Sequence, residues 1–195
     1  MIKCTPRFLL LLLLLLPLIA GCNIVRETSP PRSATEELLI STAAERAAGR
    51  MMASFPAGTK VFVDAQYFEG LDTKYTISAI RDQLLKDGAQ LVADRGTADI
   101  VVEIRSGAQS IDDDSMLVGI PATDMPLPLT SSTFKFPEVA LFKKAQRIGT
   151  AKIAMTAYDQ KSGLYRFTLG PNSGLSYETK WTVLFFSWSS QDFRE

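Results

Sequence analysis

Three adjacent aspartates, Asp112–Asp114, form the densest group of carboxylates in the chain. Carboxylate oxygens are the ligands that Ca²⁺ prefers, so a calcium site is one interpretation. The run lacks the alternating spacing and the central glycine of a calcium-binding loop, and adjacent side chains diverge rather than converge. We therefore predict a solvated turn that follows a strand, and we assign no metal ligand.

A single carboxylate, Asp64, interrupts a segment that is otherwise apolar. A carboxyl group in such surroundings can have a raised pKa and act as an acid or base, but a structural pair with backbone or arginine is commoner. We expect the structural role. Ser-Lys and paired-carboxylate mechanisms leave no reliable local pattern in this sequence, so they are neither supported nor excluded.

The chain has no histidine. This absence removes the usual general base at neutral pH, the nucleophile pairs that need histidine, and most zinc or copper sites. The 21 basic and 21 acidic residues balance, so no basic surface indicates a nucleic-acid partner. We assign no catalytic residue and no cofactor, and we expect a non-enzymatic binding or assembly module. A histidine-free envelope hydrolase that uses carboxylate or Ser/Lys chemistry is the alternative.

The N-terminus has the pattern of a secretory signal. Lys3 and Arg7 precede an apolar run, Phe8–Ala20, that ends in Gly21 and Cys22. A single transmembrane helix is the alternative, but the uncharged stretch is barely long enough to span, and Pro17 and the Gly-Cys ending oppose it. The ending 18–22 resembles the lipobox of bacterial lipoproteins. The resemblance implies cleavage between Gly21 and Cys22 and the attachment of acyl chains such as palmitate to Cys22.

Processing would change both the charge and the cysteine content of the chain. Removal of residues 1–21 deletes two basic residues, which leaves 19 basic against 21 acidic groups, and it deletes Cys4. An acylated Cys22 can form no disulfide, so packing alone must hold the domain together. By the same resemblance, Asn23 in place of an aspartate favours the outer membrane. We therefore expect a bacterial cell-envelope protein that faces the periplasm.

The remaining chain divides into a tether and one domain. Residues 22–32 show no periodicity and contain Pro30-Pro31, which favours an extended backbone. Residues 33–195 have the size of a single α+β domain. We predict one mixed β-sheet with a βαβ crossover and a C-terminal antiparallel meander, and two helices packed on one face.

Local patterns place these elements. Ser33 and Glu36 form a capping-box pattern, and an apolar stripe at helical spacing follows as far as Met51. Residues 60–67 form a predicted strand and residues 75–87 a second helix, which ends at Gly88. Residues 90–93 and 99–105 are predicted strands, so strand, helix and strand form a parallel crossover unit. Residues 149–158 and 164–169 are predicted to form a hairpin through a turn at 159–163.

A long proline-rich loop is predicted at about 111–147. Its prolines cannot join a central strand ladder, so its large apolar residues have no evident route to the core. Large exposed apolar patches mark contacts with partners or membranes. The alternative is that the loop folds back and covers the sheet. The candidate interaction residues are Leu117, Val118, Ile120, Leu127, Leu129, Phe134, Phe136 and Phe142.

The chain ends on a predicted strand at 180–189. Large apolar side chains alternate on both of its faces, with Trp181, Val183 and Phe185 on one and Leu184, Phe186 and Trp188 on the other. Such a strand is expected to be buried on both sides or covered by a partner.

Several segments resemble a family of uncharacterised bacterial envelope lipoproteins, a domain of unknown function. They are Arg32–Ala47, Val61–Asp64 with Tyr67, Gly119–Ala122 and Ala151–Ala154. More loosely, the element order is similar to that of envelope lipoproteins related to the curli-assembly channel subunit. That resemblance implies a sheet with helices on one face and makes a homo-oligomer or an envelope protein partner an expectation, beside the membrane contact through Cys22.

Overall fold

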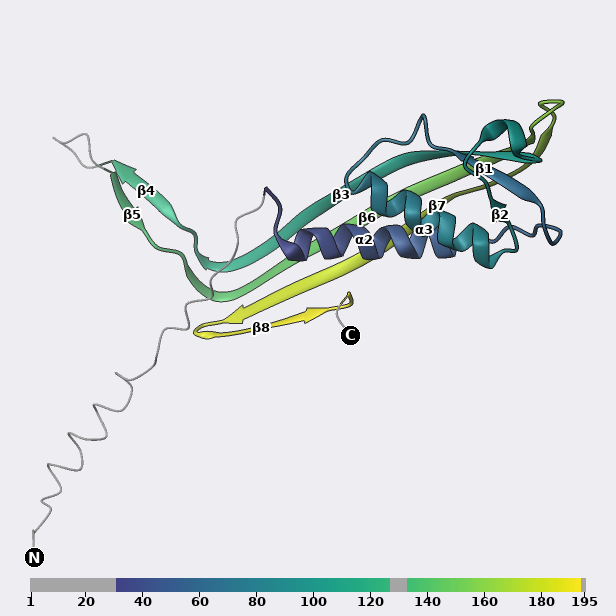
Figure 1. Ribbon diagram of the computed structural model, residues 1–195. Coiled ribbons are helices and arrows are strands. Elements are labelled where there is room, and N and C mark those ends of the chain that lie inside the picture. The colour runs from purple at the N-terminus through teal and green to yellow at the C-terminus, as the bar shows by residue number, and fades with distance from the viewer. Residues whose placement is uncertain (1–30, 127–132, 194–195) are drawn as a thin grey trace, which may run out of the picture. The chain divides into compact units, whose positions relative to one another are not determined.

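The computed structural model describes residues 31–126 and 133–193 (Figure 1). Arg32–Glu195 is one compact unit. Its described elements are α2 (Ala34–Gly49), β1 (Lys60–Asp64), α3 (Thr73–Lys86), β2 (Gln90–Leu91), a 3-10 turn (Arg95–Thr97), β3 (Ile100–Ile120), β4 (Thr123–Pro126), β5 (Thr133–Phe136), β6 (Val139–Asp159), β7 (Tyr165–Val183) and β8 (Phe186–Gln191). The predicted cleavage site at Gly21 and Cys22, most of the predicted tether, Leu127 and Leu129 lie outside the described residues.

The sheet joins a parallel part to an antiparallel part. Six strands lie in the order β2-β1-β3-β6-β7-β8, and β1 pairs in parallel with both β2 and β3. From β3 onward every neighbouring pair is antiparallel. Helices α2 and α3 pack on the same face of this sheet (Figure 1). The predicted α+β class, the crossover and the meander are therefore confirmed.

Helix α2 begins as the sequence predicts. The Ser33 side chain accepts a hydrogen bond from the Glu36 amide, and the Glu36 carboxylate accepts one from the Ser33 amide. The helix ends at Gly49, so Met51 lies beyond it, although the Met51 side chain is buried. Helix α3 is followed by Gly88 with φ +93°, the left-handed conformation that was predicted there.

Two glycines let α2 approach the sheet closely. A Cβ built on Gly174 of β7 would lie 2.6 Å from the Ala47 nitrogen and still closer to the Ala43 carbonyl oxygen. A Cβ on Gly149 of β6 would lie 2.6 Å from the Leu39 carbonyl oxygen. Small residues on both sides therefore bring the helix backbone directly onto β6 and β7.

The predicted loop at 111–147 is wrong. Strands β3 and β6 pair from Ile100 opposite Asp159 to Ile120 opposite Val139, so both ends of that segment belong to long strands. Its described prolines stand only outside those strands, in the short hairpin β4-β5 and its two connections, where no central ladder is interrupted. This part of β3 has polar residues on both faces. It therefore lacks the alternation of apolar and polar residues from which a strand is predicted.

The C-terminal strand predicted at 180–189 is also wrong. The chain turns at Leu184 and Phe185, where Leu184 has φ +53°, and β8 then pairs back on β7 with Val183 opposite Phe186. The segment therefore contains the end of β7, a turn and the start of the edge strand β8 rather than one strand. Phe185 and Phe186 are 94% and 73% exposed, so burial on both sides is excluded within the described chain.

The core lies between the two helices and the sheet. It is built from aliphatic, methionine and alanine side chains of α2, α3, β1, β3 and β6, among them Ala43, Ala47, Val61, Ile80, Leu84, Val102, Ile104, Ile153 and Met155. These residues all belong to the unit that begins at Arg32. No helix of the described residues is long and apolar enough to cross a membrane.

Candidate functional site

The antiparallel strands present two chemically different faces. On β7, the Ser176 hydroxyl donates to the Leu39 carbonyl of α2 at 2.6 Å, so Ser176 faces the helices. Because successive side chains in a strand point to opposite faces, Trp181 and Val183 face away from them. Residues directly opposite each other in neighbouring strands share a face, so the same assignment extends to β3, β6 and β8.

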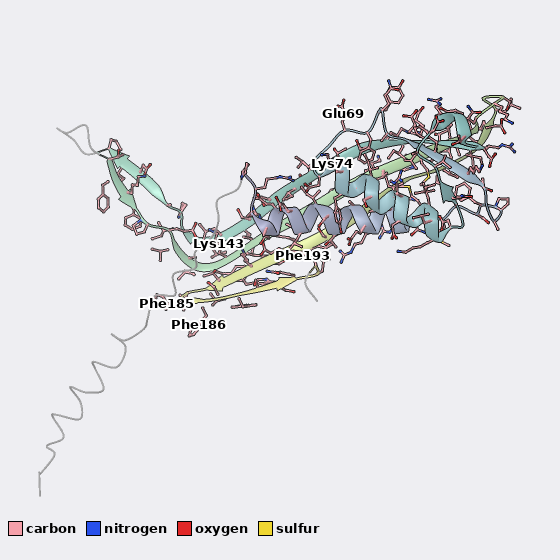
Figure 2. All side chains as sticks on the ribbon, in the orientation of Figure 1. Glu69, Lys74, Lys143, Phe185, Phe186 and Phe193 are labelled. Carbon is pink, nitrogen blue, oxygen red and sulfur yellow. The ribbon has the colours of Figure 1, made fainter. Side chains whose placement is uncertain are left out.

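One end of the helix-free face is apolar across four strands. We call this the apolar surface, and we define it as Met116 and Val118 of β3, Phe142 of β6, Trp181 and Val183 of β7, Phe186 and Trp188 of β8, and Phe185 at the turn. Figure 2 shows Phe185 and Phe186 where β7 turns into β8. The two indoles are stacked, with ring centroids 6.1 Å apart and an interplanar angle of 18°. Such contiguous exposed aromatic area is typical of a contact surface.

The structure brings together only some of the predicted interaction residues. Val118 and Phe142 are directly opposite each other within the apolar surface. Leu117 points to the other face, and Ile120 lies at the end of β3, where it is half exposed. Phe134 and Phe136 lie in β5, in the separate hairpin, and Phe134 is opposite Met125.

Sequence reasoning expected the apolar residues after Lys180 to be buried or covered by a partner, but it missed that they lie on two paired strands, β7 and β8, beside Val118 and Phe142. The alternation of large apolar residues after Lys180 was the available signal, but it was interpreted as a single strand. The turn at Leu184 and Phe185 contains no glycine, proline, asparagine or aspartate, so nothing in the local sequence indicated a hairpin. Met116 was missed because it follows a polar stretch.

A row of polar side chains crosses the sheet on the helix side. Asp113, Arg147, Glu178 and Gln191 lie opposite one another on β3, β6, β7 and β8. Arg147 donates to Asp113 at 2.9 Å and to Glu36 of α2 at 2.7 Å. Burial lowers the pKa of Arg147, but these two acceptors outweigh it, and the net pKa is raised. The Asp112–Asp114 run is therefore part of a strand, and the predicted turn is wrong.

Glu178 is the most buried charged group of this row. Its side chain is 2% exposed, one oxygen accepts from Gln191 at 3.2 Å and lies 3.4 Å from the Lys180 ammonium, and the other has no protein partner. It borders a pocket of about 260 Å³ together with Asp113, Arg147 and Lys180. Across residues 31–126 and 133–193, no three acidic or cysteine side chains are grouped closely enough to hold a metal ion.

Asp64 has the structural role that was expected. Its carboxylate pairs with Arg95 at 3.1 Å and accepts from the Gln66 amide at 3.1 Å. Arg95 also donates to the Tyr158 hydroxyl at 2.7 Å. The carboxylate is therefore fixed between a backbone donor and a guanidinium.

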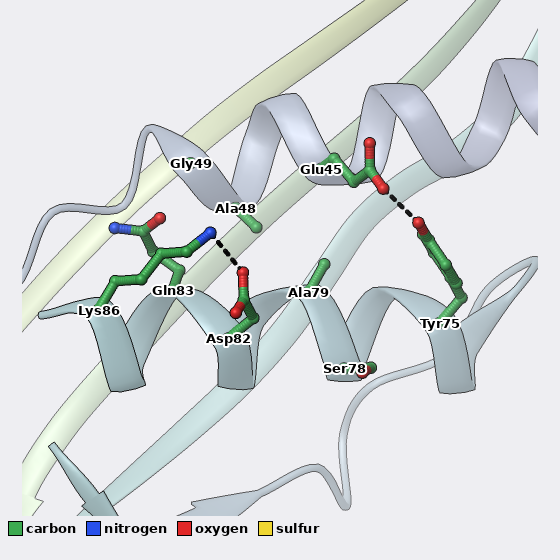
Figure 3. Close-up of a pocket in the computed structure, with 9 residues that line it drawn as sticks. All are labelled: Glu45, Ala48, Gly49, Tyr75, Ser78, Ala79, Asp82, Gln83 and Lys86. Carbon is green, nitrogen blue, oxygen red and sulfur yellow. Dashed lines mark hydrogen bonds and ion pairs between the residues drawn. The ribbon is translucent and has the colours of Figure 1, made fainter. Parts of the chain in front are cut away.

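A second pocket of about 430 Å³ lies between α2 and α3 (Figure 3). Its two carboxylates are engaged: Glu45 accepts from the Tyr75 hydroxyl, and Asp82 pairs with Lys86 at 2.6 Å. The hydrogen bond to Glu45 raises the pKa of Tyr75, which keeps the phenol protonated. The Tyr75–Glu45 hydrogen bond connects the two helices, whereas the Asp82–Lys86 pair lies within α3, so both carboxylates of the pocket have a protein partner.

Comparison with known proteins identifies the chain only at the level of a family. The model of a family of unknown function, DUF6655, matches residues 19–181. The match includes Cys22 and ends at Trp181, so β8 and Phe185 lie beyond it. No curated protein matches the chain. Since the matched residues make up most of its length, the chain belongs to the family of unknown function DUF6655.

Proposed function

We propose that this protein is a lipid-anchored component of the bacterial cell envelope, whose folded domain is a binding or assembly module rather than an enzyme. The observation that carries the proposal is the apolar surface. Phe185, Phe186 and Trp188 are each at least half exposed at one end of an ordered sheet. An exposed cluster of this kind is costly in water and typical of a surface that is covered in use.

The N-terminal sequence supports the anchor. The residues before Cys22 are small, follow an apolar run and resemble a lipobox, and the following Asn23 favours the outer membrane. One acyl chain binds a membrane marginally, whereas two or more bind stably. The segment from Cys22 to Arg32 is predicted to be extended, and an extended chain of this length reaches on the order of 30 Å.

The engagement of several carboxylates outside the Glu178 pocket supports a module over an enzyme. Asp64, Glu45 and Asp82 each have a protein partner, and Arg147 joins Asp113 to Glu36. The arrangement of helices on one face of a mixed sheet also agrees with the looser resemblance to curli-assembly lipoproteins. That resemblance favours assembly with further copies or with another envelope protein.

Substitution of the two cysteines tests the anchor. Cys22→Ser should abolish acylation and leave the unprocessed precursor. Cys4→Ser is the matched control, because Cys4 lies in the segment that cleavage removes, and processing should continue. Mass spectrometry of the N-terminus and fractionation of the membranes decide between these results. An unmodified Cys22, or cleavage elsewhere, would overturn the proposed anchor.

Crosslinking in the native envelope tests the module. Partners or further copies should be captured through residues of the apolar surface. The purified protein should be inactive on panels of esters, glycosides and peptides. Turnover that a single serine or carboxylate substitution abolishes would replace this proposal with the histidine-free hydrolase.

A further inference from the structure

The side chains of the apolar surface, and of the row beside it, change in type from one cross-strand row to the next. On β7 and β8 the first row is Thr179 opposite Ser190, the next is Trp181 opposite Trp188, and the third is Val183 opposite Phe186. Phe185 follows at the turn and is 94% exposed. The order is therefore hydroxyl groups, then indoles, then hydrocarbon and phenyl groups.

Strands β3 and β6 repeat this order. Asp114 lies opposite Gln146, Met116 opposite Lys144, and Val118 opposite Phe142. Lys144 is the one charged residue within the apolar and indole rows, and it stands in the indole row. The nearest carboxylate on this face, Asp114, lies one row further back.

This gradient matches the gradient of a lipid surface. Indoles and lysines favour the headgroup region, while aliphatic and phenyl groups favour the acyl chains. Rows two residues apart are about 6.7 Å apart along the strands, so the indole and phenyl rows with the turn span a depth of about 10 Å. Interfacial protein segments bury about 5–10 Å into the boundary between headgroups and acyl chains.

A protein partner would call for a different pattern. Protein interfaces have an apolar centre surrounded by a polar rim. Here the polar row borders the apolar surface on one side, while on β7 and β8 the opposite side ends at the exposed Phe185 and Phe186. A one-sided gradient is the pattern expected of a surface that enters a layer.

The length of chain before the domain is compatible with such contact. Helix α2 begins at Ala34, and its first turn is tied to the sheet by the ion pair of Glu36 with Arg147, which lies opposite Glu178. Val183, which lies opposite Phe186, follows Glu178 by five residues on β7. The distance from Glu178 to Val183 along the strand is therefore about 17 Å. Ten fully extended residues, the number from Cys22 to Arg32, span at most about 33 Å, so the length of chain permits an acyl chain on Cys22 and the turn at Phe185 to enter one bilayer.

We propose that the apolar surface is a lipid-contacting surface, with Trp181, Trp188 and Lys144 at the headgroups and Phe185 and Phe186 deepest. The proposal deepens the proposed function, since it names the lipid of the anchoring membrane as what covers this surface. It does not depend on acylation of Cys22, because the contact is made by side chains of the folded domain.

The two tryptophans provide a direct probe. Trp181 and Trp188 are the only tryptophans in the chain, so all indole emission reports on this surface. The processed full-length protein is reconstituted into vesicles of phosphatidylethanolamine and phosphatidylglycerol that carry bromine near the headgroup end or deep in the acyl chain. Shallow bromine should remove about half of the emission and deep bromine less, because the indoles lie at the boundary.

Paired substitutions test which residues insert. Phe185→Ser with Phe186→Ser should abolish the quenching, and it should weaken vesicle binding of residues 32–195 about tenfold or more, as the loss of buried phenyl groups does. Leu164→Ser with Tyr165→Ser is the matched control, because these side chains are 68% and 67% exposed at the opposite end of β7. The control pair should leave both readouts unchanged.

The outcomes separate the lipid surface from other occupants and from the anchor. Equal emission in brominated and plain vesicles to which the protein is bound would overturn the proposal. Loss of acrylamide quenching with rising protein concentration, in the absence of lipid, would overturn it in favour of a second copy. If Cys22 proves unmodified but residues 32–195 are still quenched by shallow bromine, the anchor fails and the lipid surface stands.

Discussion

Gly174 shows how a single missing side chain positions a helix. A methyl group there would collide with the backbone of α2 at Ala43 and Ala47, neither of which can move without shifting the helix. We expect Gly174→Ala to destabilise the domain by about 2–3 kcal/mol or more, in the upper range for overpacked sites. Gly49→Ala is the control, because nothing lies within 4 Å of that position and alanine favours a helix end. Urea denaturation followed by circular dichroism measures both, and equal stability of the two variants would contradict the role of Gly174.

Asp159 gives the β6-β7 turn a pH dependence. The backbone amide of Ser162 lowers the pKa of Asp159, and Arg166 and the Ser162 hydroxyl lower it further. Because the folded-state pKa lies below the unfolded value of about 3.9, the carboxylate stabilises the fold above that pH, and this contribution is lost as the pH falls through the folded pKa.

Asp159→Asn keeps an acceptor oxygen but removes the charge. The variant should have a lower Tm than the natural chain at pH 7, and the difference should shrink below a pH of about 4 as the natural carboxyl takes up its proton. Thermal scans from pH 7 to pH 2 check this. Asp124→Asn on the exposed strand β4 is the control, and a difference for Asp159→Asn that is constant with pH would contradict the assignment.

At the scale of the element, the sequence predicted those helix ends and strands that are determined by residues close together in the chain. The capping box at Ser33 and the glycine after α3 specify where those helices begin and end, and the β-branched run at Ile100–Ile104 specifies a strand. The continuation of β3 through Asp112–Asp114 could not be predicted, because the strand depends on pairing with β6, which is distant in the sequence, and the central Asp113 is bound there by Arg147.

For the candidate site, the sequence identified some of the residues but not the contacts between them. Val118 and Phe142 were identified by their size and their lack of a core position, but their contact depends on strand register. The two tryptophans were visible as residues, yet their stacking requires the turn at Leu184, which has no turn-forming residue. Register and unusual turns are properties of the tertiary fold.

The hairpin β4-β5 gives a test at this scale. Phe134 is 53% exposed and lies in a two-stranded sheet separate from the core, so it has little burial to lose. We expect Phe134→Ser with Phe136→Ser to leave the Tm nearly unchanged. Ile153→Ser in the core should cost several kcal/mol and lower the Tm sharply. A comparable loss of Tm in both variants would show that the hairpin is part of the core.

At the scale of the whole molecule, the sheet has two regions along its strands, one that forms the core and one that carries the apolar surface. Where α2 and α3 cover it, the side chains of β3 and β6 build the core; beyond Glu36 the same strands carry the apolar surface. Strand β6 pairs with β3 and β7 over most of its 21 residues and so connects both regions. The position of the exposed aromatic residues is therefore determined by the same ladder that organises the core.

The seating of α2 on β6 and β7 has a consequence for the order of events during synthesis. This helix is the first described element of the chain, but the glycine and serine that receive it, Gly174 and Ser176, come about 130 residues later. Until they have been made, α2 lacks the β7 part of its packing surface, so this helix cannot reach its final position before most of the chain has been synthesised. The helix made first is thus among the last elements to complete its packing.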